Sequence, residues 1–287
     1  MPSPTELLDA RVTLVTDADD ARVADYRHVR EGDLVGRRNA FVAEGEMVLR
    51  ALIERGRFPL RSVLLGRARL VTLAPWLERL PPEVPIYVGE ARVLEAIAGF
   101  DIHRGVLGLG DRGAEPSAAE LLAGLGPGPR LVVALEALTN HDNVGGIFRS
   151  AAAFGADAVL LDGRCCDPLY RKAIRVSIGA ALCLPFARAG ATASMLDALR
   201  AAGFVTLALS PRRDATDIVE LRNPGRMPER VALLLGTEGP GLSSGAMGAA
   251  ERVVRIAIHP EIDAVNVSTA GAIAMHEYRS VFPLGRA

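Results

Sequence analysis

The strongest constraint on the fold is a regular alternation of apolar runs and helical segments that begins at Arg130. Continuous apolar runs, such as LVVALEAL over 131–138 and FVTLAL over 204–209, are typical of strands buried on both faces of a parallel sheet. A segment with helical spacing follows the first run at 143–156. Strands that alternate with helices in this way predict an α/β domain with a parallel sheet and helices on both faces.

A smaller α/β domain is predicted before that point. Apolar residues recur at helical spacing over 38–55, and short strand-like runs lie at 62–65 and 85–88. Gly, Pro and Ala then become frequent, and the Gly-Pro-Gly-Pro run at 126–129 is incompatible with regular structure. We therefore expect a small α/β domain over 1–112, a linker over 113–129 with room for one short helix at 118–122, and the larger α/β domain over 130–287.

Composition and charge exclude several classes of protein. Of the 287 residues, 49% are hydrophobic and 23% are charged, which is ordinary for a globular protein. The net charge of −1 gives no overall field toward nucleic acid, so an RNA partner requires a local basic surface. The three cysteines form no CxxC pair and the five histidines show no ligand spacing, so we expect neither a disulfide framework nor a metal site. The sequence shows no signal-peptide pattern and no apolar run of about 18 residues, so we expect a cytoplasmic protein without a membrane span.

The first of three loops that follow strand-like runs contains an amide and a guanidinium. Asn143 lies where a helix would begin, and Arg149 follows six residues later among small and apolar neighbours. Asn143 suits the N-cap of that helix. Arg149 suits either an internal ion pair or a site held ready for an anion.

The second and third loops complete the pattern. LLLGTEGPGLS over 233–243 contains three glycines and Glu238, which suits close approach of a ligand, although a plain turn has the same composition. In the third loop, Asn266 or Ser268 suits the cap of the closing helix. Because carboxyl ends of parallel strands meet at one edge of a sheet, the three loops predict one shared site there. The first loop is not GxGxxG, because Gly145 and Gly146 are adjacent, and no Gly-Lys-Ser/Thr follows the second loop; these features disfavour a nucleotide-dependent oxidoreductase and a P-loop.

In this order, the three segments resemble the motifs of the SpoU (TrmH-type) RNA ribose methyltransferases of the SPOUT class. NHDNVGGIFRSAAAFG is similar to the first motif, LLLGTEGPGLS to the second and IAIHPEIDAVNVSTAGAIAMHEY to the third. The resemblance covers about residues 130–282. More loosely, the N-terminal segment FVAEGEMVLRALIERG is similar to the small, ribosomal-protein-like domain with which many members bind RNA.

The resemblance implies properties that composition does not show. These are a deep trefoil knot in the C-terminal domain, a homodimer formed through that domain, and S-adenosylmethionine held by the loops of the knot. The implied reaction is methylation of a ribose 2′-hydroxyl in rRNA or tRNA. The residues that the resemblance places at the cofactor are Leu235, Gly236, Ile256, Ile258, Val265 and Ser268.

The same resemblance assigns catalysis to Arg149, Asn143, Glu238 and Asn266. A guanidinium stays protonated in proteins, so we expect Arg149 to stabilise the developing alkoxide or to clamp a phosphate rather than to act as a base. The other three residues would then hold Arg149 and the ribose in line. Local positive charge for RNA binding is expected at Arg37, Arg38, Arg171, Lys172 and Arg175.

The third motif departs from the family pattern. Ala257 stands in place of the family's Pro, and Ala264 in place of its first Ser. The missing hydroxyl at Ala264 leaves open an alternative, a catalytically inactive RNA-binding or ribosome-assembly protein that keeps the fold. Arg149 and Glu238 are both present, and they favour an active enzyme.

Overall fold

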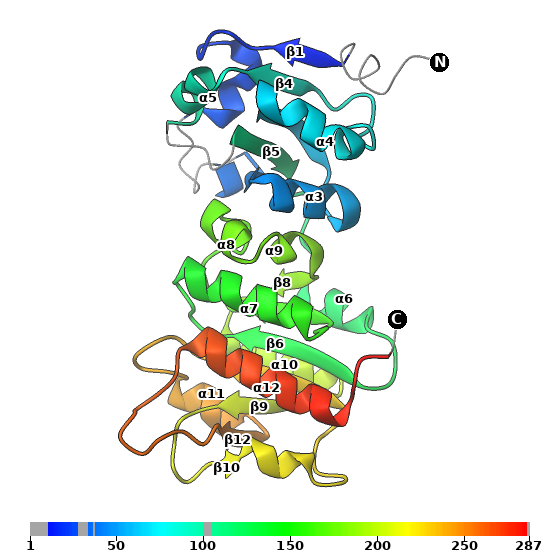
Figure 1. The fold of residues 1–287 in the computed structure, drawn as a ribbon. Coiled ribbons are helices and arrows are strands. Elements are labelled where there is room, and N and C mark those ends of the chain that lie inside the picture. The colour runs from blue at the N-terminus through cyan, green and yellow to red at the C-terminus, as the bar shows by residue number, and fades with distance from the viewer. Residues whose placement is uncertain (1–10, 28–33, 37, 100–104, 286–287) are drawn as a thin grey trace. The chain divides into compact units, whose positions relative to one another are not determined.

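The chain folds into two compact units, which are labelled by element in Figure 1. The computed structural model describes residues 11–27, 34–36, 38–99 and 105–285. Unit 1 combines Met1–Ala114 with Leu169–Cys183, and unit 2 combines Glu115–Pro168 with Leu184–Ala287.

Unit 1 is a five-stranded sheet with helices on both faces. Its strands are β1 (Val12–Leu14), β2 (Ala40–Glu44), β3 (Leu60–Gly66), β4 (Ile86–Gly89) and β5 (Val106–Asp111), and its longer helices are α3 (Glu46–Arg55), α4 (Leu70–Leu77) and α5 (Ala91–Ala98). The order is β1-β4-β3-β5-β2, with β5 antiparallel to both of its neighbours. Successive side chains of a strand point to opposite faces, so Leu64 packs against α5 whereas Val63 and Leu65 pack against α3 and α4.

The stretch Leu169–Cys183 belongs to unit 1 by its contacts, although it follows the first motif in sequence. Its helix α8 (Arg171–Val176) packs on β2, and α9 (Ala180–Cys183) packs on α3. The two helices are joined through Gly179, whose φ of +78° is readily adopted only by glycine. The sequence pattern did not indicate this packing, because helical spacing does not say which sheet a helix covers.

Unit 2 is a seven-stranded sheet in the order β10-β12-β9-β11-β6-β7-β8, and all of its strand pairs are parallel. The strands are β6 (Arg130–Leu135), β7 (Ala158–Leu161), β8 (Phe186–Arg188), β9 (Val205–Leu209), β10 (Thr216–Asp217), β11 (Arg230–Leu235) and β12 (Arg252–Arg255). The helices are α6 (Ala118–Ala123), α7 (His141–Ala153), α10 (Thr192–Ala201), α11 (Ser244–Ala249) and α12 (Val267–Val281). The predicted α/β fold with a parallel sheet is therefore confirmed, whereas the trefoil knot stays a prediction.

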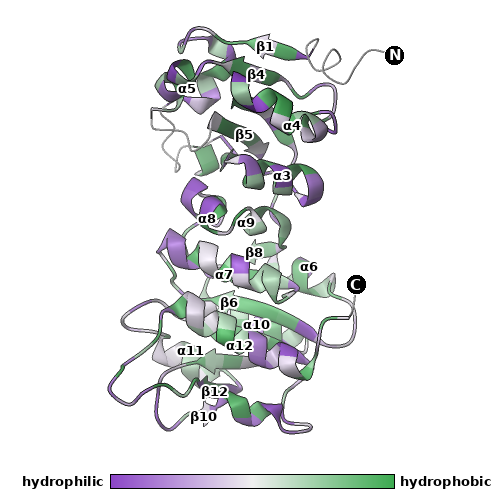
Figure 2. Ribbon diagram, in the orientation of Figure 1, coloured by the Kyte–Doolittle hydropathy of each residue, from purple (hydrophilic) through white to green (hydrophobic). Residues whose placement is uncertain are grey.

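Both faces of the unit 2 sheet are covered, which explains its uninterrupted apolar strands. Figure 2 shows β6 as largely hydrophobic, and its residues after Arg130 are all buried. On one face, Leu234 packs in a core with side chains of α6, α10 and α11. The next residue, Leu235, points to the other face and lies against Gly271 of α12.

The helix α6 lies inside the stretch predicted as a linker, where Ala118 and Leu122 are buried in the core of unit 2. Ser117 and Glu120 form a capping box at its start. The boundaries expected from the sequence, 1–112, 113–129 and 130–287, stay a prediction about functional domains.

Candidate active site

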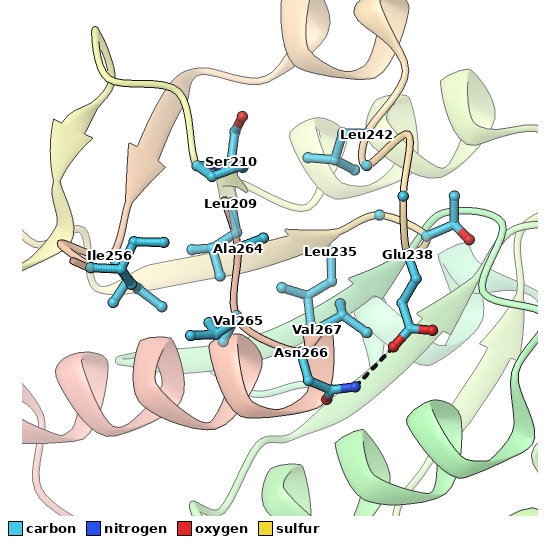
Figure 3. A pocket seen from close by; sticks show the side chains of 17 residues that line it. Leu209, Ser210, Leu235, Glu238, Leu242, Ile256, Ala264, Val265, Asn266 and Val267 are labelled. Carbon is cyan, nitrogen blue, oxygen red and sulfur yellow. Dashed lines mark hydrogen bonds between the residues drawn. The ribbon is translucent and has the colours of Figure 1, made fainter. Parts of the chain in front are cut away.

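A cavity of about 330 Å³ lies at the carboxyl edge of the unit 2 sheet. It is bounded by the ends of β9 and β11, by the loops after β11 and β12, and by the first turn of α12 (Figure 3). Carboxyl ends of parallel strands converge at one edge, so distant stretches of sequence meet here. The lining residues are 209–211, 235–239, 241–242, 256, 258, 264–267 and 270.

The side chain of Asn266 connects the three loops. Its Nδ2 donates to Asn143 Oδ1 at 3.0 Å and to Glu238 Oε1 at 2.9 Å. Figure 3 shows Asn266 and Glu238 pointing toward one another. One amide group therefore joins Asn143 to the carboxylate of the second loop. Asn143 is buried in the first turn of α7, and the N-cap expected at Asn143 is Asn140 instead.

The carbonyl end of the same side chain caps α12. Asn266 Oδ1 accepts from the backbone N of Ser268 at 2.9 Å and from its Oγ at 2.6 Å. Because both amide hydrogens and the carbonyl oxygen are used within the protein, the geometry suits Asn266 to holding other groups in place.

The second loop can close only because residue 236 is a glycine. A Cβ at Gly236 would lie 2.4 Å from the backbone N of Leu242, closer than any real contact. Across the same loop, the N–H of Gly241 donates to the carbonyl of Thr237 at 3.1 Å. Gly239 and Gly241 have φ values of +81° and +72°, which side chains rarely allow.

Arg149 lies exposed on α7, two turns after the buried Asn143. Among the residues that the structure describes, none forms a hydrogen bond or ion pair with Arg149. Of the two interpretations that the sequence left open, an internal ion pair is thus not observed within this part of the chain. An exposed, uncommitted guanidinium suits an anionic ligand.

The cavity wall combines apolar side chains with backbone polar groups. Leu209, Ile256 and Val265 contribute aliphatic surface, as Figure 3 shows, and Gly236 leaves the backbone accessible. A volume of about 330 Å³ with this mixture suits a small ligand that carries both apolar and polar groups.

The residues expected at a cofactor fall on the cavity with one exception. Leu235, Gly236, Ile256, Ile258 and Val265 line it. Ser268 is not among the described lining residues, because its hydroxyl turns back to Asn266. Sequence reasoning missed 209–211, although the apolar run that ends there, followed by Ser-Pro, has the signature of another strand end at the same edge.

All five basic residues expected to contact RNA belong to unit 1. Arg37 falls outside the described residues. Arg38 donates to Asp25 at 2.6 Å, and Arg171 and Arg175 lie 3.5 and 4.0 Å from the buried carboxylate of Glu44. Lys172 is exposed. A role of these residues in RNA binding stays a prediction.

The thiols of unit 2 are not suited to nucleophilic chemistry. Burial raises the pKa of Cys165 to about 12 and that of Cys166 to about 11, so both remain protonated at neutral pH. In the described parts of the chain, no cluster of three His, Cys, Asp or Glu side chains could hold a metal ion. No helix within those same parts combines the length and the apolar character needed to cross a membrane.

Comparison with known proteins agrees with the geometry. A model of the SpoU rRNA methylase family matches residues 130–276. A tRNA/rRNA methyltransferase of Mycobacterium tuberculosis, itself described as uncharacterised, is 38% identical over 267 residues, covering 92% of this chain and 90% of that protein. A 23S rRNA guanosine-2′-O-methyltransferase from a Burkholderia species is 29% identical over 193 residues, which is 67% of this chain and 76% of that protein.

The fold also matches solved structures. The crystal structure of an AdoMet-bound rRNA methyltransferase from Sinorhizobium meliloti superposes with a TM-score of 0.79 at 23% identity, covering 96% of this chain and all of the other. The family match spans the whole unit 2 sheet and all three loops around the cavity. This chain therefore belongs to the SpoU rRNA methylase family of RNA methyltransferases.

Proposed function

We propose that the protein transfers a methyl group from S-adenosylmethionine to a ribose 2′-hydroxyl in rRNA or tRNA. The observation that carries this proposal is the junction at Asn266, which ties Asn143 and Glu238 together at the cavity while Arg149 stays uncommitted on the same helix as Asn143. Family membership supports methyl transfer to RNA. The choice of the 2′-oxygen is supported by the activity named for the Burkholderia relative.

The cavity suits S-adenosylmethionine as the methyl donor. The aliphatic side chains of Leu209, Ile256 and Ile258 suit an adenine ring, and the glycine-rich loop suits hydrogen bonds from backbone atoms. This cofactor supplies a methyl group already activated on a sulfonium sulfur. The protein then has to bind the cofactor and the RNA, orient the two reacting groups and stabilise the charge that develops.

Arg149 has the main electrostatic role. As the bond from the 2′-oxygen to the methyl carbon forms, the bond from that carbon to sulfur breaks, and the hydroxyl proton is released to solvent. Negative charge develops on the 2′-oxygen as this proton leaves. A protonated guanidinium stabilises such charge or holds the neighbouring phosphate, whereas it is a poor base. Asn143 and Glu238, held by Asn266, position the reacting groups, and positioning accounts for much of the rate in reactions of this kind.

The remaining expectations become part of the same proposal. Family resemblance supports a knotted C-terminal domain that dimerises with a second copy, an N-terminal domain that binds RNA, and work in the cytoplasm on rRNA or tRNA. The basic residues Arg38, Arg171, Lys172 and Arg175 are candidates for the RNA-contacting surface.

Nucleoside analysis of RNA tests the proposal. Total RNA from cells with and without the protein, and RNA treated with purified protein and S-adenosylmethionine, would be digested and analysed by mass spectrometry. We expect one 2′-O-methylated nucleotide to depend on the protein. Methylation of a base instead would overturn the ribose assignment, and failure to bind S-adenosylmethionine even with RNA present would favour the inactive RNA-binding alternative.

A further inference from the structure

A buried carboxylate outside the cavity holds both ends of the loop that lines it. Glu136 directly follows β6 and is 3% exposed. Its backbone N–H donates to the carbonyl of Leu235, where the loop begins, at 2.9 Å. Its carboxylate accepts from the backbone N of Ser243, where the loop ends, at 2.9 Å, and from Ser243 Oγ at 2.8 Å. Glu136 therefore holds together the two ends of the loop formed by residues 236–242, and we call its bonds to Leu235 and Ser243 the clasp.

Both oxygens of Glu136 face only hydrogen-bond donors. Besides Ser243, the hydroxyl of Thr192 and Nη2 of Arg164 each lie 3.2 Å from its Oε1. The same two side chains also contact Asp162, which is 1% exposed: the Thr192 hydroxyl lies 3.2 Å from Asp162 Oδ2, and Arg164 Nε donates to it at 3.1 Å. This arrangement requires a carboxylate at position 136, because an amide would have to turn an N–H toward one of the donors.

The clasp is connected to the cavity through Leu242. Leu242 precedes Ser243 and lines the cavity, and its backbone N is the atom against which Gly236 packs. Loss of the bonds between Glu136 and Ser243 therefore loosens the contact between Gly236 and Leu242, where the two ends of the loop meet. Glu136 itself is not among the described residues that line the cavity.

We propose that Glu136 is a positioning residue that sets the affinity of the 236–242 loop for the methyl donor without touching it. This inference rests on the proposed function, since it assumes that S-adenosylmethionine occupies the cavity. A residue of this kind changes how tightly the cofactor binds. It changes the rate at saturating cofactor much less.

The test is Glu136→Gln in the full-length protein. Calorimetry with S-adenosylhomocysteine should show binding about tenfold weaker than in the unsubstituted protein, because an amide cannot accept from all the donors that face the carboxylate, so the end of the loop at Ser243 is held less firmly. The KM for S-adenosylmethionine should rise by a similar factor, while kcat at saturation changes less than about twofold. Amide hydrogen exchange at 237–243 should be faster in the free variant.

The matched control is Glu251→Gln. Glu251 also accepts a hydrogen bond from a backbone N–H, that of Thr206 at 2.8 Å, and it pairs with Arg200. It lies just before β12, at the opposite edge of the same sheet, so the chemical change is the same and the loop is not involved. We expect cofactor affinity to remain unchanged in this variant.

A second variant keeps the test decisive if Glu136→Gln does not fold. Ser243→Ala removes the hydroxyl bond to Glu136, and with it the bond from Ala246 N to Ser243 Oγ that caps α11, but it leaves the backbone bond to Glu136, so affinity should fall by about threefold. The double variant should lose less affinity than the product of the two single losses, because the residues act through one contact.

The outcomes separate the two proposals. If the unsubstituted protein does not bind the cofactor, the proposed function fails. If it binds and Glu136→Gln or, in its place, Ser243→Ala binds equally well, the clasp has no positioning role. A fall in kcat at saturating cofactor without a change in affinity would also overturn this inference.

Discussion

At the scale of single residues, the site depends on the side chain of Asn266, which has to donate and accept hydrogen bonds at the same time. Asn266 donates to Asn143 and Glu238 and accepts from Ser268. An amide can do both at once, whereas a carboxylate of the same shape can only accept. The identity of residue 266 is thus set by the charge and hydrogen-bonding character of its neighbours.

Asn266→Asp should separate the capping role from the positioning role. Asp caps a helix as well as Asn does, so the thermal midpoint should change little. Its carboxylate cannot donate to Asn143, and it would face the carboxylate of Glu238, so methyl transfer should fall by about a hundredfold. The matched control is Asn140→Asp at the N-cap of α7, where the side chain accepts from Asp142 N. Equal rates in both Asp variants would contradict the assignment.

Arg149→Ala tests the uncommitted guanidinium. Because this side chain is exposed and has no partner in the described structure, its removal should change stability by less than about 0.5 kcal/mol. Loss of a group that stabilises developing charge should lower the single-turnover rate by about a hundredfold or more. Calorimetric melting and a single-turnover assay measure the two effects. Unfolding of the variant would show that Arg149 is structural.

At the scale of elements, the site requires α7 and α12 to pack closely. A Cβ at Gly146 of α7 would lie 3.1 Å from the Cβ of Ser268 in α12, which is tighter than an ordinary contact. Ser268 is hydrogen-bonded to Asn266. A small displacement between these helices therefore reaches the junction of the three loops.

Gly146→Ala should lower activity without lowering stability to the same extent. Alanine is favoured over glycine inside a helix by about 1 kcal/mol, which offsets the crowding at Ser268. We expect unfolding free energy to change by less than about 1 kcal/mol and methyl transfer to fall severalfold. Gly248→Ala in α11 is the control, because nothing lies within 4 Å of its Cβ, and it should leave activity unchanged. Similar activity in the two alanine variants would show that the contact between α7 and α12 accommodates the added Cβ without disturbing the site.

At the scale of the whole molecule, stability at low pH depends on buried carboxylates that accept hydrogen bonds from several loops of unit 2. Burial raises the pKa of Asp162, but hydrogen bonds from Ala137, Cys165 and Arg164 outweigh it, so the net pKa lies below its ordinary value. A carboxyl whose pKa is lower in the folded than in the unfolded protein stabilises the fold fully above its unfolded pKa of about 3.9. That contribution is lost as the pH falls through the folded pKa.

Denaturant unfolding of Asp162→Asn at several pH values tests this linkage. The variant should be less stable than the original protein at pH 7, and the difference should shrink as the pH is lowered below about 4. Asp197→Asn is the control, because its carboxylate is exposed and pairs only with Arg200 at the surface in the described structure. A stability difference for Asp162→Asn that stays constant with pH would exclude the proposed linkage.

The sequence alone indicated most of the architecture of unit 2. Strands buried on both faces leave uninterrupted apolar runs, and the runs at 131–138 and 204–209 both contribute strands to the parallel sheet, as β6 and β9. It also indicated which loops matter, since glycines such as Gly236 are needed where a backbone folds back on itself. These signals are local, so they can be recognised without knowledge of the tertiary structure.

Only the tertiary structure decided which distant side chains meet. The order β9-β11-β6 brings Leu209, Glu136 and the loop after β11 to one edge, and no local pattern specifies that order. For the same reason, the packing of 169–183 on unit 1 and the clasp between Glu136 and Ser243 were not foreseen. Periodicity reports whether a residue is buried, whereas a hydrogen-bond partner is chosen by the path of the chain between two positions that lie far apart along it.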